Sequence, residues 1–425
     1  MNNSFADDKV VLSHEFKYDS MENIELIMET CSVIIPTKNA GDFFAKILQT
    51  LRTQEGIEKI EIIVIDSGST DQTIAIAEEY HSIIKRIKPE HFTHSGARNI
   101  GAEIASGKYL VFLTQDALPV SRFWLYQMIK KMETNECVAA SCKEIPREKC
   151  DLIHRAGIYY HQGKKFLDIE QKDQIRVKQN NENQYEHRIN SSLNNVALLT
   201  KADVFRKFCF IGNYAEDLAY GVQLSNAGFK IAQLGTIAVI HSHIRPVFYY
   251  LKRTYLDVLA LNNILIENSQ ENFEYGKMIA AIEAITYIGS QMISRLKSLE
   301  LPLSIVEVVK ELMNDVGFIN YSLVNDKEFN EFFEFLKQIK TTEIDSSDKE
   351  IKFLIVQFEY QIANVFDCLS KRQDVLVQQD LDEVEKAISS SLAVSIGKIL
   401  GTYMAENKND LVFKKQIHEK IAKGV

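Results

Sequence analysis

One run of apolar residues limits the kind of fold that this chain can adopt. Lys108 to Leu113 reads KYLVFL, the pattern of a strand that is buried on both faces of a parallel sheet. The helix expected before it, Asn99 to Ser106, is rich in small residues and ends at Gly107. Ligands of open α/β sheets bind beyond the carboxyl ends of such strands. The polar tip Thr114 to Asp116 is therefore a candidate for chemistry, although Asp116 can also simply begin a surface turn.

The same order of strand, polar turn and helix recurs before this run. Apolar strands are expected at Cys31 to Ile35, Glu61 to Ile65 and Ile83 to Ile87, with helices between them. Such alternation predicts right-handed βαβ units and a parallel sheet. The turn after the first strand lacks the sequence G-x-G-x-x-G. This absence excludes the phosphate-binding turn of a dinucleotide-binding Rossmann domain, and with it an NAD-dependent oxidoreductase.

Composition narrows the class of protein. The 425 residues are enough for two domains, and 46% hydrophobic and 25% charged residues are typical of a soluble globular chain. A net charge of −9 argues against a nucleic-acid partner. Met1 to Ser20 does not have the pattern of a secretory signal, and the longest apolar run, Met278 to Ile293, is interrupted by Glu283. The six cysteines show no C-x-x-C spacing, so we expect free thiols and a cytoplasmic protein.

Two charged side chains stand out in the first half of the expected sheet. Asp66 follows the second strand, where its carboxylate can accept a hydrogen bond from a planar ligand edge such as a pyrimidine imide. Arg98 lies on the first turn of a helix that opens near Ser95. Its guanidinium suits a diphosphate or can stack beside a base, and the alternative is a surface salt bridge.

Later in the chain, two further sets are candidates. Glu216 and Asp217 begin a helix, where carboxylates either interact with the helix dipole or act as a general base. His241 and His243 end the strand Thr236 to Ile240, and alternate residues of a strand point the same way. They are structural histidines or candidate metal ligands.

The remaining segments predict the domain organisation. Residues 1–29 read as an extension with a short helix around Met21 to Met28, and Cys137 to Asn190 reads as strands and loops. From about Leu259 to the end at Val425, apolar residues recur every three or four positions, which predicts a helical bundle after a first domain of residues 30–258. The expected helices are Met278 to Leu296, Ile305 to Met313, Phe329 to Ile339, Ile351 to Leu369 and Leu381 to Met404.

That helical region has two readings. Its apolar stripes are most simply the core of the bundle. The alternative is a module for homo-oligomer formation or peripheral membrane association, indicated by aromatic-rich Phe329 to Phe335 and by basic Lys414, Lys415, Lys420 and Lys423.

Four segments together resemble the family 2 glycosyltransferases of the GT-A fold, and particularly their bacterial rhamnosyltransferase-like branch. They are SVIIPTKNAG, IEIIVIDSGSTDQT, HSGARNIGAEIASGKYLVFLTQDALP and YAEDLAYGVQLSNAGFKIAQLGTIAVIHSH. The resemblance covers about Cys31 to Asp257. It implies an α/β domain with a Rossmann-like, mostly parallel sheet, and it does not extend to the all-α helical domain that follows.

The resemblance also implies roles for individual residues. Asp217 would be the catalytic base, and Glu216 would orient it or the acceptor. Thr114 stands where many members have the first Asp of a D-x-D motif, and the sequence T-Q-D-A is typical of the rhamnosyltransferase-like branch. A divalent cation, Mg²⁺ or Mn²⁺, would be held by Asp116 with His241 or His243. The residues that would bind the nucleotide sugar are Thr37, Asn39, Asp66, Ser67, Arg98, Gln115 and Asp116.

The implied activity is a metal-dependent, inverting transfer of rhamnose or a similar sugar. The donor would be a dTDP- or UDP-sugar, and the acceptor a hydroxyl of a glycan or lipid-linked glycan in a growing bacterial surface polysaccharide, such as an O-antigen or capsule, at the inner face of the cytoplasmic membrane. Because neutral imidazole is the form that binds metal, activity is expected to fall below about pH 6.5. The alternative is a non-catalytic sugar-nucleotide or glycan-binding protein with the same fold, which acts in assembly through its helical domain.

Overall fold

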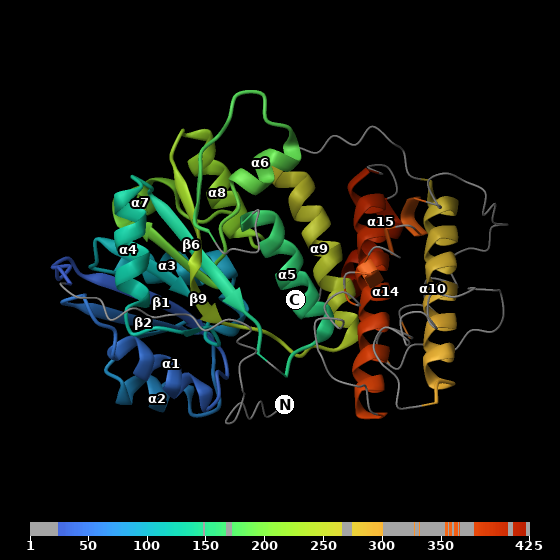
Figure 1. The fold of residues 1–425 in the computed structure, drawn as a ribbon, viewed down its shortest axis with the longest axis horizontal. Helices are drawn as coiled ribbons and strands as arrows, with labels where there is room; N and C mark the ends of the chain where they lie inside the picture. The colour runs from blue at the N-terminus through green and yellow to red at the C-terminus, as the bar shows by residue number, and fades with distance from the viewer. Residues whose placement is uncertain are drawn as a thin grey trace. The chain divides into compact units, whose positions relative to one another are not determined.

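The computed structural model describes residues 24–147, 149–166, 172–265, 274–300, 378–406 and 411–421, with scattered positions between 327 and 365 (Figure 1). The chain divides into two compact units. The first comprises Met1–Lys149 and His161–Ser242, and the second comprises Cys150–Tyr160 and His243–Val425.

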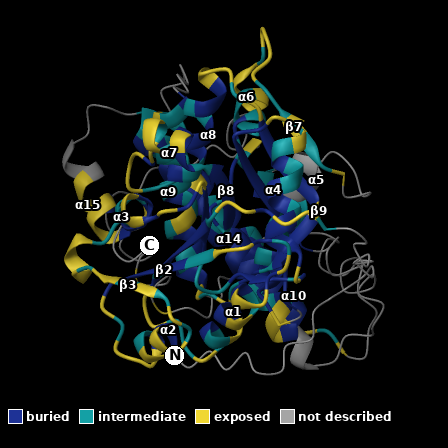
Figure 2. Cartoon of the chain, turned by 90° about the vertical axis from the view of Figure 1, so that its left-hand side faces the viewer, coloured by how far each residue is buried: buried dark blue, intermediate teal, exposed yellow. Residues whose placement is uncertain are grey.

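The first unit is built on one sheet whose N-terminal strands are parallel. These strands are β1 (Cys31–Thr37), β2 (Ile60–Asp66), β3 (Ile83–Arg86) and β4 (Tyr109–Leu113), in the order β3-β2-β1-β4. In this register Thr37 lies beside Asp66, so two of the predicted site residues end neighbouring strands. Strand β3, at the edge of the sheet, is largely exposed (Figure 2). The strands expected from the apolar runs are confirmed.

The second half of the sheet is mixed. Its order continues as β8-β6-β9-β5, and β7 pairs with β9. Strand β8 is antiparallel to both β4 and β6, whereas β6 and β9 are parallel. The α/β class and the following helical region are confirmed, but the sheet is less parallel than expected, because the chain starts β8 opposite the end of β4 and must run back. The bounds of these strands are β5 (Leu118–Pro119), β6 (Ala139–Ile145), β7 (Gln174–Arg176), β8 (Ala197–Lys201) and β9 (Ile231–Ile240).

Helices cover both faces of this sheet. Val33 and Ile35 of β1 lie in one apolar cluster with residues of α1 and α4, and Ile34 lies in another with residues of α3, α7 and α8. Successive side chains of a strand point to opposite faces, which explains this division. The helices are α1 (Phe43–Arg52), α2 (Thr73–Glu79), the 3₁₀ turn η1 (Pro89–His91), α3 (His94–Ile104), α4 (Trp124–Thr134), α7 (Ala202–Phe208) and α8 (Glu216–Asn226).

Helix α3 lies unusually close to the sheet at Gly101. A Cβ atom at this position would lie 2.3 Å from Cγ2 of Ile34 on β1, which is closer than two carbon atoms can approach. Thr93 caps the helix, since its side chain accepts a hydrogen bond from the Gly96 backbone N–H. The helix is therefore fixed both at its start and along its length.

Two predictions about local structure were wrong. The stretch from Cys137 to Asn190 contains α5 (Leu152–Phe166) and α6 (Gln184–Asn190) in addition to strands, because a capping box at Asn183 starts α6 in a segment whose composition is polar throughout. The helix expected around Met21 to Met28 is absent from its described part, since residues 24–28 contain no helical turn and Ile27 forms a parallel bridge with Ile57.

In the second unit, helices pack around one apolar core. They are α9 (Val247–Leu265), α10 (Tyr275–Lys297), α14 (Gln378–Glu406) and α15 (Leu411–Ile421). Their core includes Leu251 and Tyr255 of α9, Ile285 of α10 and Leu392 of α14. The helices expected at Met278 to Leu296 and Leu381 to Met404 are confirmed.

The other helices expected after Leu259 lie wholly or largely outside the described residues, namely Ile305 to Met313, Phe329 to Ile339 and Ile351 to Leu369. In the part of the chain that the structure describes, none of the helices combines the length and the apolar character that crossing a bilayer requires. The division into residues 30–258 and 259–425, and the roles suggested for the helical region in oligomer formation or membrane association, stay predictions.

Candidate active site

The predicted nucleotide-binding residues meet at the carboxyl ends of β1 and β2. Asp66 is 2% exposed, and its carboxylate accepts hydrogen bonds from the Thr37 hydroxyl at 3.3 Å, the Gly68 N–H at 3.0 Å and both the N–H and the hydroxyl of Ser69. The hydroxyl of Ser67 donates to the Thr37 carbonyl at 3.0 Å. Asp66 therefore links the loops after the two strands, and its four acceptor positions are occupied within the protein.

Asn39 and Gln115 extend this network. Asn39 adopts a positive φ of 49° and its side-chain oxygen accepts from the Thr70 N–H at 2.8 Å. The Gln115 side chain accepts from the Lys38 N–H at 2.8 Å and donates to the Lys38 carbonyl at 3.3 Å, which joins the end of β4 to the loop after β1. The structure thus brings five predicted residues together in preformed loops: Thr37, Asn39, Asp66, Ser67 and Gln115.

The predicted metal ligands also lie together. Nε2 of His241 lies 3.5 Å from Oδ1 of Asp116, and Asp116, His241 and His243 offer ligand atoms that are all within 4.8 Å of one another. One carboxylate and two imidazoles are a donor set that fits a first-row divalent ion, with carboxylate oxygen suited to Mg²⁺ or Mn²⁺. The residues present therefore fit the expected cation.

Glu144 orients the buried histidine and was not predicted. Its Oε2 lies 2.8 Å from Nδ1 of His241, and because a carboxylate only accepts hydrogen bonds, Nδ1 carries the proton and Nε2 faces Asp116. The Asn194 side chain donates to the other oxygen of Glu144 at 2.5 Å. Burial by itself lowers the pKa of His241, but the charges and hydrogen bonds of Asp116 and Glu144 outweigh it and raise this pKa to about 9.

Arg147 is a second residue that sequence reasoning missed. Its side chain is fully buried and donates to the Asp116 carbonyl at 2.7 Å and to the Ser242 carbonyl at 3.1 Å. Its guanidinium also lies over the Phe43 ring, with 4.9 Å to the ring centroid. These contacts hold the chain after β4 against the chain after β9. Neither Glu144 nor Arg147 carries a sequence signal. Glu144 reaches His241 only through the pairing of β6 with β9, and Arg147 reaches Asp116 and Ser242 only in the folded chain.

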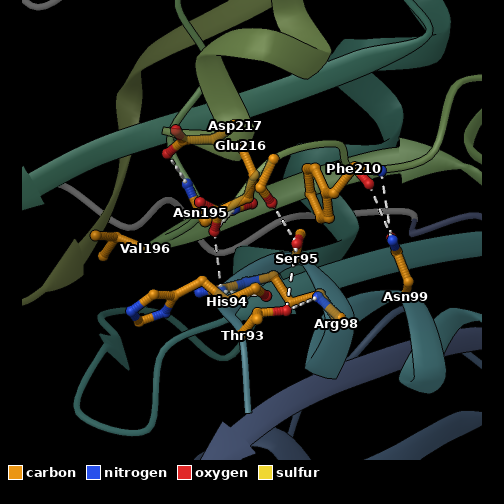
Figure 3. A network of polar contacts seen from close by, with 12 residues as sticks. Thr93, His94, Ser95, Arg98, Asn99, Asn195, Val196, Phe210, Glu216 and Asp217 are labelled. Carbon is orange, nitrogen blue, oxygen red and sulfur yellow. Dashed lines mark hydrogen bonds and ion pairs between the residues drawn. The ribbon is translucent and has the colours of Figure 1, made fainter. Parts of the chain in front are cut away.

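The acid pair at the start of α8 belongs to a second buried group (Figure 3). Glu216, 7% exposed, accepts from Nη1 of Arg98 at 3.1 Å and from the Asn195 side chain at 3.0 Å. Asp217 is less buried, and its Oδ2 accepts from the Asn195 backbone N–H at 3.0 Å. Burial and the charge of Asp217 raise the pKa of Glu216, and the positive charge of Arg98 opposes this rise. The structure thus places Arg98 with the acid pair.

The backbone before Asp217 is held in a rare conformation. Ala215, the N-cap residue of α8, has φ 53° and ψ 35°, the left-handed region that costs a non-glycine residue free energy. Such strain persists only where surrounding contacts fix the chain. The packing of the loop before Ala215 therefore helps to fix the backbone from which the Asp217 side chain projects.

Comparison with known proteins identifies the domain that carries these groups. Residues 32–190 match the family model described as glycosyl transferase family 2. This part of the chain is a family 2 glycosyltransferase domain. The resemblance seen in the first three sequence segments is thereby confirmed, and the match ends before the fourth segment, which contains the acid pair and the histidines.

The glycosyltransferase has curated relatives in two salmonellae. It is 27% identical over 231 residues to the O-antigen chain rhamnosyltransferase WbaN of Salmonella anatum. The alignment covers 51% of this chain and 67% of the relative. It is 28% identical over 223 residues to the O-antigen chain rhamnosyltransferase RfbN of Salmonella typhimurium, with 50% and 66% covered. Thus the matched region spans about two thirds of each relative. Among solved structures, residues 1–349 of TarS from S. aureus align over 89% of this chain and 90% of that chain, at 14% identity and a TM-score of 0.43.

Proposed function

We propose that this glycosyltransferase moves a sugar, rhamnose or a similar hexose, from a nucleoside-diphosphate donor to a hydroxyl of a bacterial surface glycan. The observation that carries the proposal is the grouping of Asp116, His241 and His243 within 4.8 Å at strand ends of a family 2 domain. The rhamnosyltransferase names of the two salmonella relatives support the sugar and the O-antigen type of acceptor.

The donor would bind across the ends of β1, β2 and β4. Thr37, Asn39, Asp66, Ser67 and Gln115 form connected loops there, so the base and ribose of a dTDP- or UDP-sugar would meet a preformed surface. Asp116, His241 and His243 would hold Mn²⁺ or Mg²⁺ beside the diphosphate, and the imidazole ligands favour Mn²⁺. When bound, this cation neutralises charge on the departing diphosphate.

Asp217 would act as the general base. It accepts the proton of the acceptor hydroxyl while that oxygen forms a bond to the anomeric carbon, and the bond from that carbon to the diphosphate oxygen breaks with its electron pair. One such displacement inverts the configuration at the anomeric carbon. Asp217 suits this role because its partners are two backbone N–H groups, those of Asn195 and Leu218, and Arg98 pairs with its neighbour Glu216.

The acceptor would be a glycan or a lipid-linked glycan, met in the cytoplasm at the inner face of the membrane. The protein should be incubated with a panel of dTDP-, UDP- and GDP-sugars, with Mn²⁺, Mg²⁺ or EDTA, and release of the nucleoside diphosphate should be measured. We expect one donor to be turned over in Mn²⁺ and spared in EDTA. Binding of a donor without any turnover would instead favour a non-catalytic binding protein.

A further inference from the structure

Arg98 does not lie where a nucleotide would easily reach it. The residue is 5% exposed, and Nη1 donates to the His94 carbonyl at 3.0 Å and to Oε1 of Glu216 at 3.1 Å. The positive charge of its guanidinium is therefore paired with the carboxylate of Glu216 inside the protein. A guanidinium that served mainly to bind a diphosphate would be expected to present its N–H groups to an open surface.

A short chain of contacts leads from Arg98 to Asp217 (Figure 3). Arg98 and the Asn195 side chain share the same oxygen of Glu216. The backbone N–H of Asn195 then donates to Oδ2 of Asp217 at 3.0 Å. The position of Asn195 is thus fixed from one side by Glu216, and Asn195 fixes the carboxylate of Asp217 from the other.

Helix α3 also holds the loop that leads to Asp217. The Ser95 hydroxyl donates to the Gly212 carbonyl. The Asn99 side chain donates to the Phe210 carbonyl at 3.0 Å and accepts from the Phe210 N–H at 3.2 Å. Ser95 and Asn99 thus tie one face of α3 to the loop before the strained Ala215, and Arg98 on the same helix binds Glu216 directly after it (Figure 3). The loop is thereby held to a rigid helix that is itself set closely on β1.

We propose that Arg98 is a positioning residue for Asp217, acting through Glu216 and Asn195, and not a ligand of the nucleotide. This inference rests on the proposed role of Asp217 as the base. Arg98 supplies a permanent positive charge that keeps Glu216 ionised and in place, so that Asn195 stays hydrogen-bonded to Asp217. A buried ion pair of this kind is sensitive to loss of one partner, because the other charge is then left uncompensated.

The test separates binding from turnover. Arg98→Met should lower kcat for Mn²⁺-dependent hydrolysis of the donor found in the panel at least tenfold, while calorimetry with UDP or dTDP in Mn²⁺ should give a Kd within twofold of wild type. A kcat within twofold of wild type, or a nucleotide Kd at least tenfold weaker, would overturn the proposal.

A double variant without either buried charge controls for misfolding of the single variant. Arg98→Met combined with Glu216→Gln removes both buried charges, so this double variant should fold even if the single variant does not, and its kcat should be higher than that of Arg98→Met alone. The same two limits on kcat and Kd decide the outcome for the double variant. Arg122→Met is the matched control, since Arg122 forms an ion pair with Glu55 at 3.3 Å but its side chain is 63% exposed, and we expect wild-type kcat and Kd.

Asp217→Asn belongs in the same series. If it leaves kcat unchanged, the base has been assigned wrongly in the proposed function. The nucleotide Kd of the Arg98 variants needs no turnover, and it still decides whether Arg98 is a nucleotide ligand.

Discussion

Carboxylates face a positively charged side chain at two places in this glycosyltransferase, and the charged side chain is a histidine at one place and an arginine at the other. Asp116 and Glu144 face the imidazole of His241, whereas Glu216 faces the guanidinium of Arg98. An imidazole can lose its proton in the accessible pH range and then bind a metal ion, but a guanidinium cannot.

This difference separates the two chemical tasks. His241 can lose a proton, and its neutral imidazole can then bind a divalent cation together with the neighbouring carboxylate. The arginine group keeps its charge at every working pH, so it is suited to hold acids in place, and its positive charge disfavours a bound metal ion. We therefore expect metal dependence to be a property of the histidine group alone, and proton abstraction to be a property of Asp217.

The largest effect is expected from Asp217→Asn. Asparagine keeps the size of the side chain and much of its hydrogen bonding but cannot accept a proton from the acceptor hydroxyl. Because a positioned general base contributes about 10²–10⁴-fold, kcat should fall by about that factor in steady-state assays, with the Kd of the donor almost unchanged. Glu216→Gln is the comparison. If that variant abolishes transfer while Asp217→Asn stays near wild type, the two acids have exchanged roles.

The metal-free protein should lose stability at alkaline pH through His241. Its folded pKa, raised to about 9, exceeds the ordinary value of 6.5, so the protonated imidazole stabilises the fold below about pH 6.5 and this contribution is lost as pH rises through about 9. The shift corresponds to on the order of 3 kcal/mol of unfolding free energy. Urea unfolding in EDTA at pH 7 and pH 10 measures it. In His241→Gln the decrease should be smaller by that amount, and equal decreases in both proteins would contradict the assignment.

Glu144→Gln should weaken metal binding without removing a ligand. Glu144 fixes the tautomer of His241 through Nδ1, and loss of such an orienting carboxylate typically costs 10–100-fold in metal affinity. Titration with Mn²⁺, followed by electron paramagnetic resonance of the free ion, gives the Kd directly. Glu61→Gln is a suitable control, because Glu61 is a hydrogen-bonded carboxylate of the same sheet whose contacts are with Ser32 and Ser106. Equal Mn²⁺ affinity in Glu144→Gln and wild type would remove Glu144 from the metal site.

The smallest effect is expected at Asp66, which belongs to neither group. Asp66→Ala should weaken the binding of UDP or dTDP about tenfold, or about 1.4 kcal/mol, because the loops after β1 and β2 lose their shared acceptor. Calorimetry in Mn²⁺ measures this Kd, and kcat at saturating donor should change less than the Kd. Unchanged affinity would show that nucleotide recognition does not depend on these loops.

The sequence predicted most of the first unit because its strands are buried on both faces. An apolar run such as that ending at Leu113 is hard to reconcile with any element other than a central strand, and the polar residue after each run then falls at a strand end. The start of helix α8 could also be predicted, since Glu216 and Asp217 are the acidic residues expected in the first turn of a helix. These signals are local, and local signals are the ones that a single sequence carries.

The residues that were missed depend on contacts between distant segments. Glu144 looks like any charged residue of a short strand until β6 pairs with β9 and brings it to His241. Arg98 was expected on the ligand side of the sheet, but its charge is met by Glu216, which lies 118 positions later in the chain. Tertiary pairing of this kind leaves no trace in the spacing or composition of either segment.

The contact between Gly101 and Ile34 has a consequence for engineering and for natural variation. Helix α3 carries the residues that hold the loop before Asp217, and β1 ends at Thr37, where the donor is proposed to bind. Because α3 and β1 pack so closely at Gly101, a change in the position of one element requires a change in the other. A side chain at position 101 would push α3 away from β1, because its Cβ would collide with Ile34. Exchange of donor preference between relatives is therefore expected to succeed when α3 and β1 are transplanted together and to fail when either is moved alone.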